Sequence, residues 1–537
     1  MRLIACSALV GAAIVAAWWW LGVPVAMPAS PLAPGAKLYC LSYSPFRDRQ
    51  TPFDRTSPID PIQIEDDLAR LAPLTDCVRT YSTELGLDRV AEIAERHGLK
   101  VIQGVWLGRE RARNRVEIAT AVAIARRHPG TVRAIVAGNE VLLRGELSAD
   151  DLAGLIREVK AQVTMPVTYA EVWEFWLRNR AVADAVDFVT IHVLPYWEDL
   201  PIPADQAAEH VADIRRMVAE AFPGKDILLG EVGWPSAGRM REGALPSPAN
   251  QARVVQEVLA VGNRDGFRVN LIEAFDQPWK RQLEGTVGGH WGLLDGATRE
   301  RKFAWGAPVS NHPAWPWQAA VGIALAVAVF VVAGVASRNA AARLNWGEWF
   351  GVGAMALVPG VLFGWALANV PLESLGVGGW AHSLAMLMVA LAAPVLGAAA
   401  LVRNVPVPAF SCVLARAPER PTDRLVMALG LSRIALCVLA TEVALGLAFD
   451  PRYRDFPFAP FGAAATPFLV LRLVGAGAGA TRRRETAETT MATVLGASTV
   501  YIAWHEGFAN WQALALCAVL AGLTFALLRS PGAPDSE

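Results

Sequence analysis

Hydrophobic and polar positions divide the chain into three regions. Residues 3–27 form one apolar run that follows a single basic residue, Arg2. Between residues 37 and 315, short apolar runs alternate with segments of mixed polarity, which is typical of a globular domain. Residues 316–529 are again mostly apolar. The pattern therefore predicts a globular domain that lies between two hydrophobic ends.

Within the globular region, apolar runs of strand length alternate with helical patterns. Eight runs predict strands, at residues 37–43, 77–81, 100–106, 132–138, 166–171, 187–193, 227–231 and 269–275. Seven windows predict helices, near residues 62–72, 86–97, 114–128, 149–163, 174–184, 204–221 and 248–264. Strands that are apolar throughout and alternate with helices indicate a parallel sheet covered by helices. The fold class is therefore α/β, and eight such units predict a (β/α)8 TIM barrel.

A doubly wound open sheet is the alternative to the barrel. Many sheets of that kind carry a G-x-G-x-x-G motif after the first strand, where it holds a dinucleotide. No such motif follows residues 37–43. This difference favours the barrel.

The N-terminal apolar run is long enough to cross a bilayer, which takes about 20 residues. It contains three consecutive tryptophans at positions 18–20, and no clear small-residue cleavage site follows it. We interpret residues 1–27 as an uncleaved transmembrane anchor, with a cleavable signal peptide as the alternative. Residues 28–36 are rich in proline and predict a linker to the globular domain at 37–315.

The C-terminal region, residues 316–529, predicts an all-α multi-span transmembrane bundle. The fifth of its apolar stretches is the weakest, because Arg472 interrupts it. The seven stretches lie at residues 317–336, 347–368, 380–402, 425–449, 463–480, 489–506 and 508–528.

The charges of the short loops predict the orientation of these spans. If the N-terminus is inside, the inner loops hold ten arginines, at positions 338, 343, 403, 416, 420, 424, 482, 483, 484 and 529. The short outer loops hold only Arg452 and Arg454. The positive-inside rule predicts this asymmetry. We therefore expect a multi-pass protein of a bacterial inner membrane, with a periplasmic globular domain and a cytoplasmic tail at residues 530–537.

Composition narrows the functional class. Hydrophobic residues make up 53% of the 537 positions and charged residues only 18%, which excludes a disordered chain. The net charge of -1 gives no electrostatic footprint for nucleic acid. Six cysteines are too few for a disulfide scaffold. Cys40 and Cys77 lie on adjacent predicted strands, either as a disulfide or as two buried thiols.

In a TIM barrel, functional side chains lie just past the C-terminal ends of the strands. Two glutamates, Glu140 and Glu231, follow predicted strands 4 and 7 and are expected to face one cleft. A carboxylate pair of this kind suits cleavage of a glycosidic bond, because one acid protonates the leaving oxygen while the other attacks the anomeric carbon. A separation of about 5–5.5 Å predicts a covalent intermediate and retained stereochemistry.

Aromatic residues at the same rim offer flat faces for sugar rings. The alternative for Trp106 is a place in the barrel core. Trp197, Trp234 and Trp279 are the stronger candidates for sugar contact. The full set of candidates is Trp106, Trp173, Trp176, Tyr196, Trp197, Trp234, Trp279 and Trp291.

Four motifs make the globular region recognisable. They are GNEV at 138–141, GEVGWPSAG at 230–238, EAFDQPWK at 273–280 and HWGLLD at 290–295. In this order, and at predicted strand ends, they resemble glycoside hydrolase family 17, the β-1,3-glucanases and glucanosyltransferases. The resemblance covers about residues 37 to 305.

The resemblance implies roles for individual residues. Glu140 matches the acid/base, Glu231 the nucleophile, and Asn139 the hydrogen-bond donor to the sugar 2-hydroxyl. The further residues that we expect to bind substrate are Tyr81, Tyr196, Trp197, Trp234, Glu273, Asp276, Trp279 and Lys280. Family members commonly have glutamate where this chain has Gln277, so the auxiliary acid is an amide here.

Several polar residues have a structural interpretation beside the functional one. Glu273 is either a direct site residue or an acid inside the barrel, and Glu171 either binds sugar or orients a neighbour. His192 is expected to be a hydrogen-bonding core histidine rather than a metal ligand. Asp276 and Lys280 are candidates for a structural ion pair. No cluster has metal-ligand spacing, so we predict neither a metal nor a cofactor.

The sequence as a whole predicts a membrane-bound retaining glycosidase. It would cleave or transfer β-1,3-glucan chains by double displacement at two glutamates. The alternative is a glucan-binding or remodelling subunit of a membrane β-glucan synthase or export complex. The expected partners are a β-1,3-glucan or oligosaccharide and membrane lipid, with a glucan synthase or exporter as a further candidate.

Overall fold

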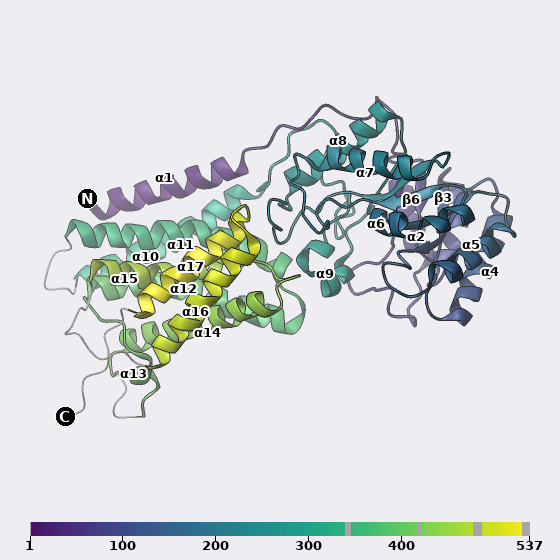
Figure 1. Cartoon of the computed structure of the whole chain (residues 1–537). Coiled ribbons are helices and arrows are strands. Elements are labelled where there is room, and N and C mark those ends of the chain that lie inside the picture. Colours follow the sequence, from purple (N-terminus) through teal and green to yellow (C-terminus); the bar gives the residue numbers. More distant parts are fainter. Residues whose placement is uncertain (1, 339–344, 417–420, 476–485, 529–537) are drawn as a thin grey trace. The chain divides into compact units, whose positions relative to one another are not determined.

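The computed structural model describes residues 2–338, 345–416, 421–475 and 486–528 (Figure 1). It divides the chain into two compact units. The barrel unit consists of Val25–Gly238 and Gly243–Val309. The helical unit consists of Met1–Pro24, Arg239–Glu242 and Ser310–Glu537.

The barrel unit contains eight parallel strands that close on themselves. They pair in chain order, and β1 pairs with β8 through Cys40 with Asn270 and Leu41 with Leu271. This closure confirms the (β/α)8 barrel and excludes the open sheet. The strands are β1 Cys40–Ser42, β2 Cys77–Arg79, β3 Lys100–Val105, β4 Val132–Asn139, β5 Val167–Val172, β6 Val189–His192, β7 Ile227–Val232 and β8 Val269–Leu271.

Helices follow the strands and begin where the sequence supplies a cap. Asp60 accepts from Ile62 N before α2, and Ser148 accepts from Asp151 N before α5. The helices of this unit are α2 Pro61–Leu71, α3 Val90–Arg96, α4 Arg111–Arg127, α5 Ala149–Lys160, α6 Trp173–Arg178, α7 Ala207–Ala221, α8 Pro248–Asp265 and α9 Arg281–Gly288. Short 3-10 turns lie at Leu87–Arg89, Arg180–Ala185 and Pro278–Lys280.

Apolar side chains fill the space between strands and helices, and one covalent link joins two strands. Leu41, Ile135 and Leu229 are fully buried in this core. Cys40 and Cys77, at the starts of β1 and β2, form a disulfide with Cα atoms 4.3 Å apart. The structure thus decides between the two states that the sequence left open.

The helical unit carries the apolar ends of the chain. Within the described residues, each of the seven C-terminal apolar stretches overlaps a helix, and residues 476–480 of the fifth lie outside them. Trp18 of α1 is fully buried within this unit. The helices are α1 Arg2–Gly22, α10 Trp315–Arg338, α11 Trp346–Glu373, α12 Gly376–Val402, α13 Phe410–Leu414, α14 Arg424–Phe449, α15 Phe458–Val474, α16 Thr486–Glu506 and α17 Trp511–Leu528.

Six helices in the described parts of the chain are long and apolar enough to cross a membrane. They are Leu3–Gly22, Trp315–Arg338, Trp346–Glu373, Gly376–Val402, Arg424–Phe449 and Trp511–Leu528. The helix with Arg472, Phe458–Val474, is apolar but shorter. Of the arginines that predicted the orientation, positions 343, 420, 482–484 and 529 lie outside the described residues, as does the tail at 530–537.

Candidate active site

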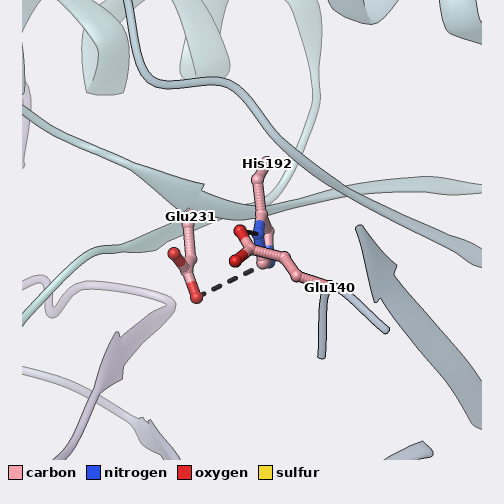
Figure 2. A group of neighbouring side chains, drawn as sticks. All are labelled: Glu140, His192 and Glu231. Atoms are coloured by element: carbon pink, nitrogen blue, oxygen red, sulfur yellow. Dashed lines mark hydrogen bonds and ion pairs between the residues drawn. The ribbon is translucent and has the colours of Figure 1, made fainter. Parts of the chain in front are cut away.

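Two glutamates and a histidine meet at the C-terminal rim of the barrel (Figure 2). Glu140 directly follows β4, Glu231 lies on β7, and His192 ends β6. One side-chain ligand atom from each of the three lies within 4.8 Å of the others. The two glutamate carboxylates are therefore close enough for the short separation that double displacement requires.

The backbone turn at Glu140 aims its side chain into the site. Gly138 and Glu140 have φ of 96° and 52°, and Glu140 is one of few non-glycine residues in the left-handed region. Buried Glu171 stabilises the turn, because its carboxylate accepts from Leu142 N at 3.1 Å and Leu143 N at 3.2 Å. Of the two roles considered for Glu171, the structure supports orientation of a neighbour.

A buried arginine, Arg79 of β2, contacts Glu231, His192 and Asn139. Its Nη1 donates to Glu231 Oε1 at 3.1 Å and to the Gly230 carbonyl at 2.8 Å, and it lies 3.4 Å from His192 Nε2. Its Nη2 donates to Asn139 Oδ1. Because the oxygen of the Asn139 amide is held by Arg79, the amide nitrogen is left to serve as a donor.

The two oxygens of Glu231 have different environments. Oε1 accepts from Arg79 and, at 2.9 Å, from the Tyr81 hydroxyl. Among the described residues, none donates a hydrogen bond to Oε2. The donors on Oε1 fix the orientation of the carboxylate, and Oε2 keeps its lone pairs for attack on a carbon.

The environment of Glu140 favours its carboxylate form. Burial acts to raise the pKa of Glu140, but the hydrogen bond from His192, together with the charges of Arg79 and Arg144, holds that pKa below its usual value. The bond to His192 joins Nδ1 to Oε1 at 2.7 Å. Glu140 is thus held as a carboxylate in the free site, and it must take up a proton before it can act as an acid.

A second charged group lies beside this centre. Lys280 pairs with Glu273, which is almost completely buried after β8, and the other oxygen of Glu273 has no hydrogen-bond partner among the described residues. Burial raises the pKa of Glu273 to about 7, although Lys280 acts in the opposite direction. Glu284 of α9 interacts electrostatically with Lys280 and with both Glu140 and Glu231.

The cluster of Glu140, His192 and Glu231 resembles a metal-ligand set, but its neighbour does not suit a cation. The Arg79 guanidinium lies within 3.4 Å of a ligand atom of both His192 and Glu231. A cation bound by those atoms would stand beside a permanent positive charge. The chemistry of the residues present therefore does not favour a metal ion at this cluster.

The aromatic residues divide into exposed and buried groups. Trp197 and Trp279 are half-buried, and the Trp279 ring contacts exposed Phe53 edge-to-face with centroids 5.6 Å apart. Tyr196 and Trp234 are both fully buried in the core. Their rings pack edge-to-face with centroids 6.0 Å apart, and their contact with substrate stays a prediction.

Asp276 is held by its neighbours. It is buried and accepts from Lys302 Nζ at 2.7 Å and from Gly292 N at 2.9 Å, and these contacts tie it to a neighbouring loop. Burial opposes ionisation, but Lys302 and His290 keep the pKa of Asp276 low. The expected Asp276–Lys280 pair is absent from the described contacts, because each residue has a different partner.

The contacts of Gln277 explain why this chain has an amide where family members commonly have glutamate. Its amide nitrogen donates to the carbonyls of Ser44 and Phe275, at 3.0 and 3.1 Å, and its oxygen accepts from Trp279 Nε1 at 2.8 Å. A carboxylate at this position would face two carbonyl oxygens without a donor. The amide therefore fits its surroundings and orients Trp279.

Comparison with known proteins identifies the barrel. Residues 40–292 match a protein family described as the BtgE/BtgC glycoside hydrolase domain. The barrel of this chain is thus similar to a glycoside hydrolase domain.

Individual relatives are similar over the same region. The "Probable beta-glucosidase btgE" of Aspergillus fumigatus is 31% identical over 226 residues, which are 41% of this chain and 39% of that protein. The chain therefore spans about two fifths of the length of this relative. The "Glucan 1,3-beta-glucosidase" of Saccharomyces cerevisiae is 26% identical over 252 residues, covering 43% and 80% of the two chains. A solved structure, the glycoside hydrolase family 17 β-1,3-glucanosyltransferase from Rhizomucor miehei, is 25% identical with a TM-score of 0.44. The match covers 49% of this chain and 95% of that chain.

Sequence reasoning left three residues out of the predicted site. Arg79 and His192 lie at the ends of strands β2 and β6, but a role beside the glutamates could not be derived without knowing their cross-barrel contacts. Glu284 lies on a helix rather than at a strand end. The one sequence signal near it is Gly285, whose φ of 68° and ψ of -165° interrupt α9 and mark an unusual turn.

Proposed function

We propose that this protein is a retaining glycosidase of the glycoside hydrolase family 17 type that cleaves or transfers β-1,3-glucan. The observation that carries the proposal is the placement of Glu140 and Glu231 within 4.8 Å at the rim of the barrel. The names of the fungal relatives, which include a glucan 1,3-β-glucosidase, support the substrate class.

The proposed reaction has two steps. Glu231 Oε2 bonds to the anomeric carbon while the glycosidic C–O bond breaks and Glu140 gives its proton to the leaving oxygen. Glu140, now a carboxylate, then removes a proton from the acceptor that displaces Glu231. Tyr81 and Arg79 orient Glu231 through Oε1. Asn139 donates to the sugar 2-hydroxyl, and Trp197 and Trp279 contact sugar rings.

We further propose that the helical unit anchors the enzyme in a bacterial inner membrane, with the barrel on the periplasmic side. Six helices with the length and composition of membrane spans support the anchor. The Cys40–Cys77 disulfide supports the location, since disulfides persist in oxidising compartments. In this arrangement residues 1–27 form one anchor and residues 316–529 form the other spans.

The test is product analysis with the full-length protein in detergent. A linear β-1,3-gluco-oligosaccharide is incubated with the enzyme, and its products are followed by mass spectrometry. Shorter products alone define a hydrolase, whereas products longer than the substrate define a glucanosyltransferase. Glu140→Gln and Glu231→Gln are the matched controls and should lose both kinds of product. If the wild type matches Glu231→Gln, the barrel is not catalytic and the glucan-binding alternative replaces this proposal.

A further inference from the structure

His192 is held rigidly between the two catalytic glutamates (Figure 2). Its side chain is only 1% exposed, and the ring packs against Gly230 on β7. A Cβ atom at Gly230 would lie 3.3 Å from Cδ2 and 3.4 Å from Nε2 of that ring. The glycine therefore lets the imidazole approach the neighbouring strand, and the position of both ring nitrogens is fixed.

The two ring nitrogens have different partners. Nδ1 lies 2.7 Å from Glu140 Oε1. Nε2 lies 3.4 Å from Arg79 Nη1 and 3.6 Å from Glu231 Oε1. A guanidinium group can only donate hydrogen bonds, so Nε2 must present its lone pair to Arg79. The ring proton is then on Nδ1, where it is donated to Glu140.

We propose that Arg79 and His192 together stabilise the carboxylate form of Glu140. Arg79 selects the Nδ1–H tautomer of His192. That N–H stabilises the carboxylate formed when Glu140 protonates the leaving oxygen. His192 is thus a positioning residue that keeps its own proton throughout. The proton on the leaving oxygen comes from Glu140, and the electron pair of the broken C–O bond stays with that oxygen. The inference rests on the proposed function, because it assigns Glu140 the acid/base role.

The charged groups around His192 come from three strands. Arg79 lies on β2, Glu140 follows β4 and Glu231 lies on β7. Arg144 adds to the charges that act on Glu140. A substitution at His192 leaves these groups in the chain, so a change in the pH profile reports the loss of the imidazole.

Two amide substitutions at His192 test the roles of the two ring nitrogens separately. In His192→Asn the side-chain nitrogen takes the place of Nδ1 and can donate to Glu140, whereas in His192→Gln it lies nearer the place of Nε2. We expect His192→Asn to keep kcat/KM on β-1,3-gluco-oligosaccharides within about threefold, and His192→Gln to lose about tenfold or more, as expected for loss of a supporting hydrogen bond. Without the donor the pKa of Glu140 rises, so the alkaline limb of the His192→Gln profile should move to higher pH.

A substrate with an activated leaving group separates this role from a general structural one. Dinitrophenolate leaves without a proton, so His192→Gln should cleave a dinitrophenyl β-glucoside at close to the wild-type rate. Equal losses on both substrates, or equal behaviour of the Asn and Gln variants, would overturn the proposal. A wild type that is inactive on both substrates would instead refute the proposed function itself, and this inference with it.

The tautomer can also be measured without a variant. In full-length protein with ¹⁵N-labelled histidine, nitrogen chemical shifts distinguish a protonated Nδ1 from a protonated Nε2. We expect one buried histidine in the Nδ1–H form, which should be lost in Arg79→Gln. Assignment of His192 to the Nε2–H form would contradict this proposal even if His192→Gln failed to fold.

Discussion

Lys280 pairs with Glu273, the carboxylate seven residues before it in the chain, and not with Asp276. The pair brings a half-buried positive charge and a buried carboxyl group to the end of β8, beside the proposed nucleophile. Burial is strong enough that the pKa of Glu273 is raised to about 7 despite the neighbouring ammonium group. One oxygen of Glu273 has no partner, so ionisation of this group is costly.

This raised pKa predicts a pH-dependent difference between the wild type and Glu273→Gln. Between the unfolded pKa of about 4.3 and the folded pKa of about 7, the folded state binds more protons than the unfolded state. The wild type should therefore lose stability as pH rises through this window, and the loss should end above the folded pKa. In thermal unfolding, the Tm of Glu273→Gln minus the Tm of the wild type should increase from pH 5 to pH 8. A Tm difference that does not change with pH would contradict the assignment.

Azide should distinguish the two catalytic glutamates. In Glu140→Ala with a dinitrophenyl β-glucoside, azide can enter the space of the lost base and attack the intermediate, which should raise turnover about tenfold or more and yield a β-glucosyl azide. In Glu231→Ala, azide replaces the nucleophile and should yield the α-glucosyl azide. The anomeric coupling constant of each product is measured by NMR. Interchanged products would reverse the two roles.

The disulfide between β1 and β2 should stabilise the barrel. It closes a loop with a sequence separation of 37 residues, for which the chain-entropy relation gives about 4 kcal/mol. The double variant Cys40→Ser/Cys77→Ser should therefore unfold at lower temperature than the wild type. A reducing agent should lower the Tm of the wild type and leave that of the double variant unchanged. Cys412→Ser, which changes a free thiol, is the control.

Gln277 predicts the effect of restoring the acid that the family motif usually has. In Gln277→Glu, the donors to Ser44 O and Phe275 O are lost, and Trp279 is held less firmly. We expect a lower Tm and a KM for oligosaccharide raised about threefold or more, with kcat changed less, because a binding contact is loosened and not the chemistry. Trp279→Phe should raise KM without the same loss of stability. A fall in kcat at unchanged KM would indicate a direct catalytic role for position 277.

Much of the barrel could be predicted from the sequence because its strands are buried on both faces. Each strand then appears as a short, continuous apolar run, and the ends of those runs fix where Glu140 and Glu231 lie. The fold subsequently brings Arg79 to Glu231 across a sequence separation of 152 residues. No local pattern encodes such a contact, so the role of Arg79 required the structure.

The aromatic residues illustrate the same limit. Tyr196 and Trp197 are neighbours in the sequence, yet the first is fully buried and the second half-buried. Both have the chemistry to bind a sugar, and only the packing around them decides which one has an open face. Asp276 was likewise placed at the rim correctly, but its partner Lys302 lies 26 residues further along the chain.

The left-handed backbone of Glu140 has a consequence for how this position can change over generations. An L-residue with a side chain at φ of 52° costs about 1 kcal/mol relative to a conformation that it prefers. Glycine carries no such cost there. While the reaction is under selection, the carboxylate must be retained against this local preference. In a lineage that no longer needs the reaction, glycine is the residue that should accumulate at position 140. The resulting barrel should be slightly more stable and catalytically inactive.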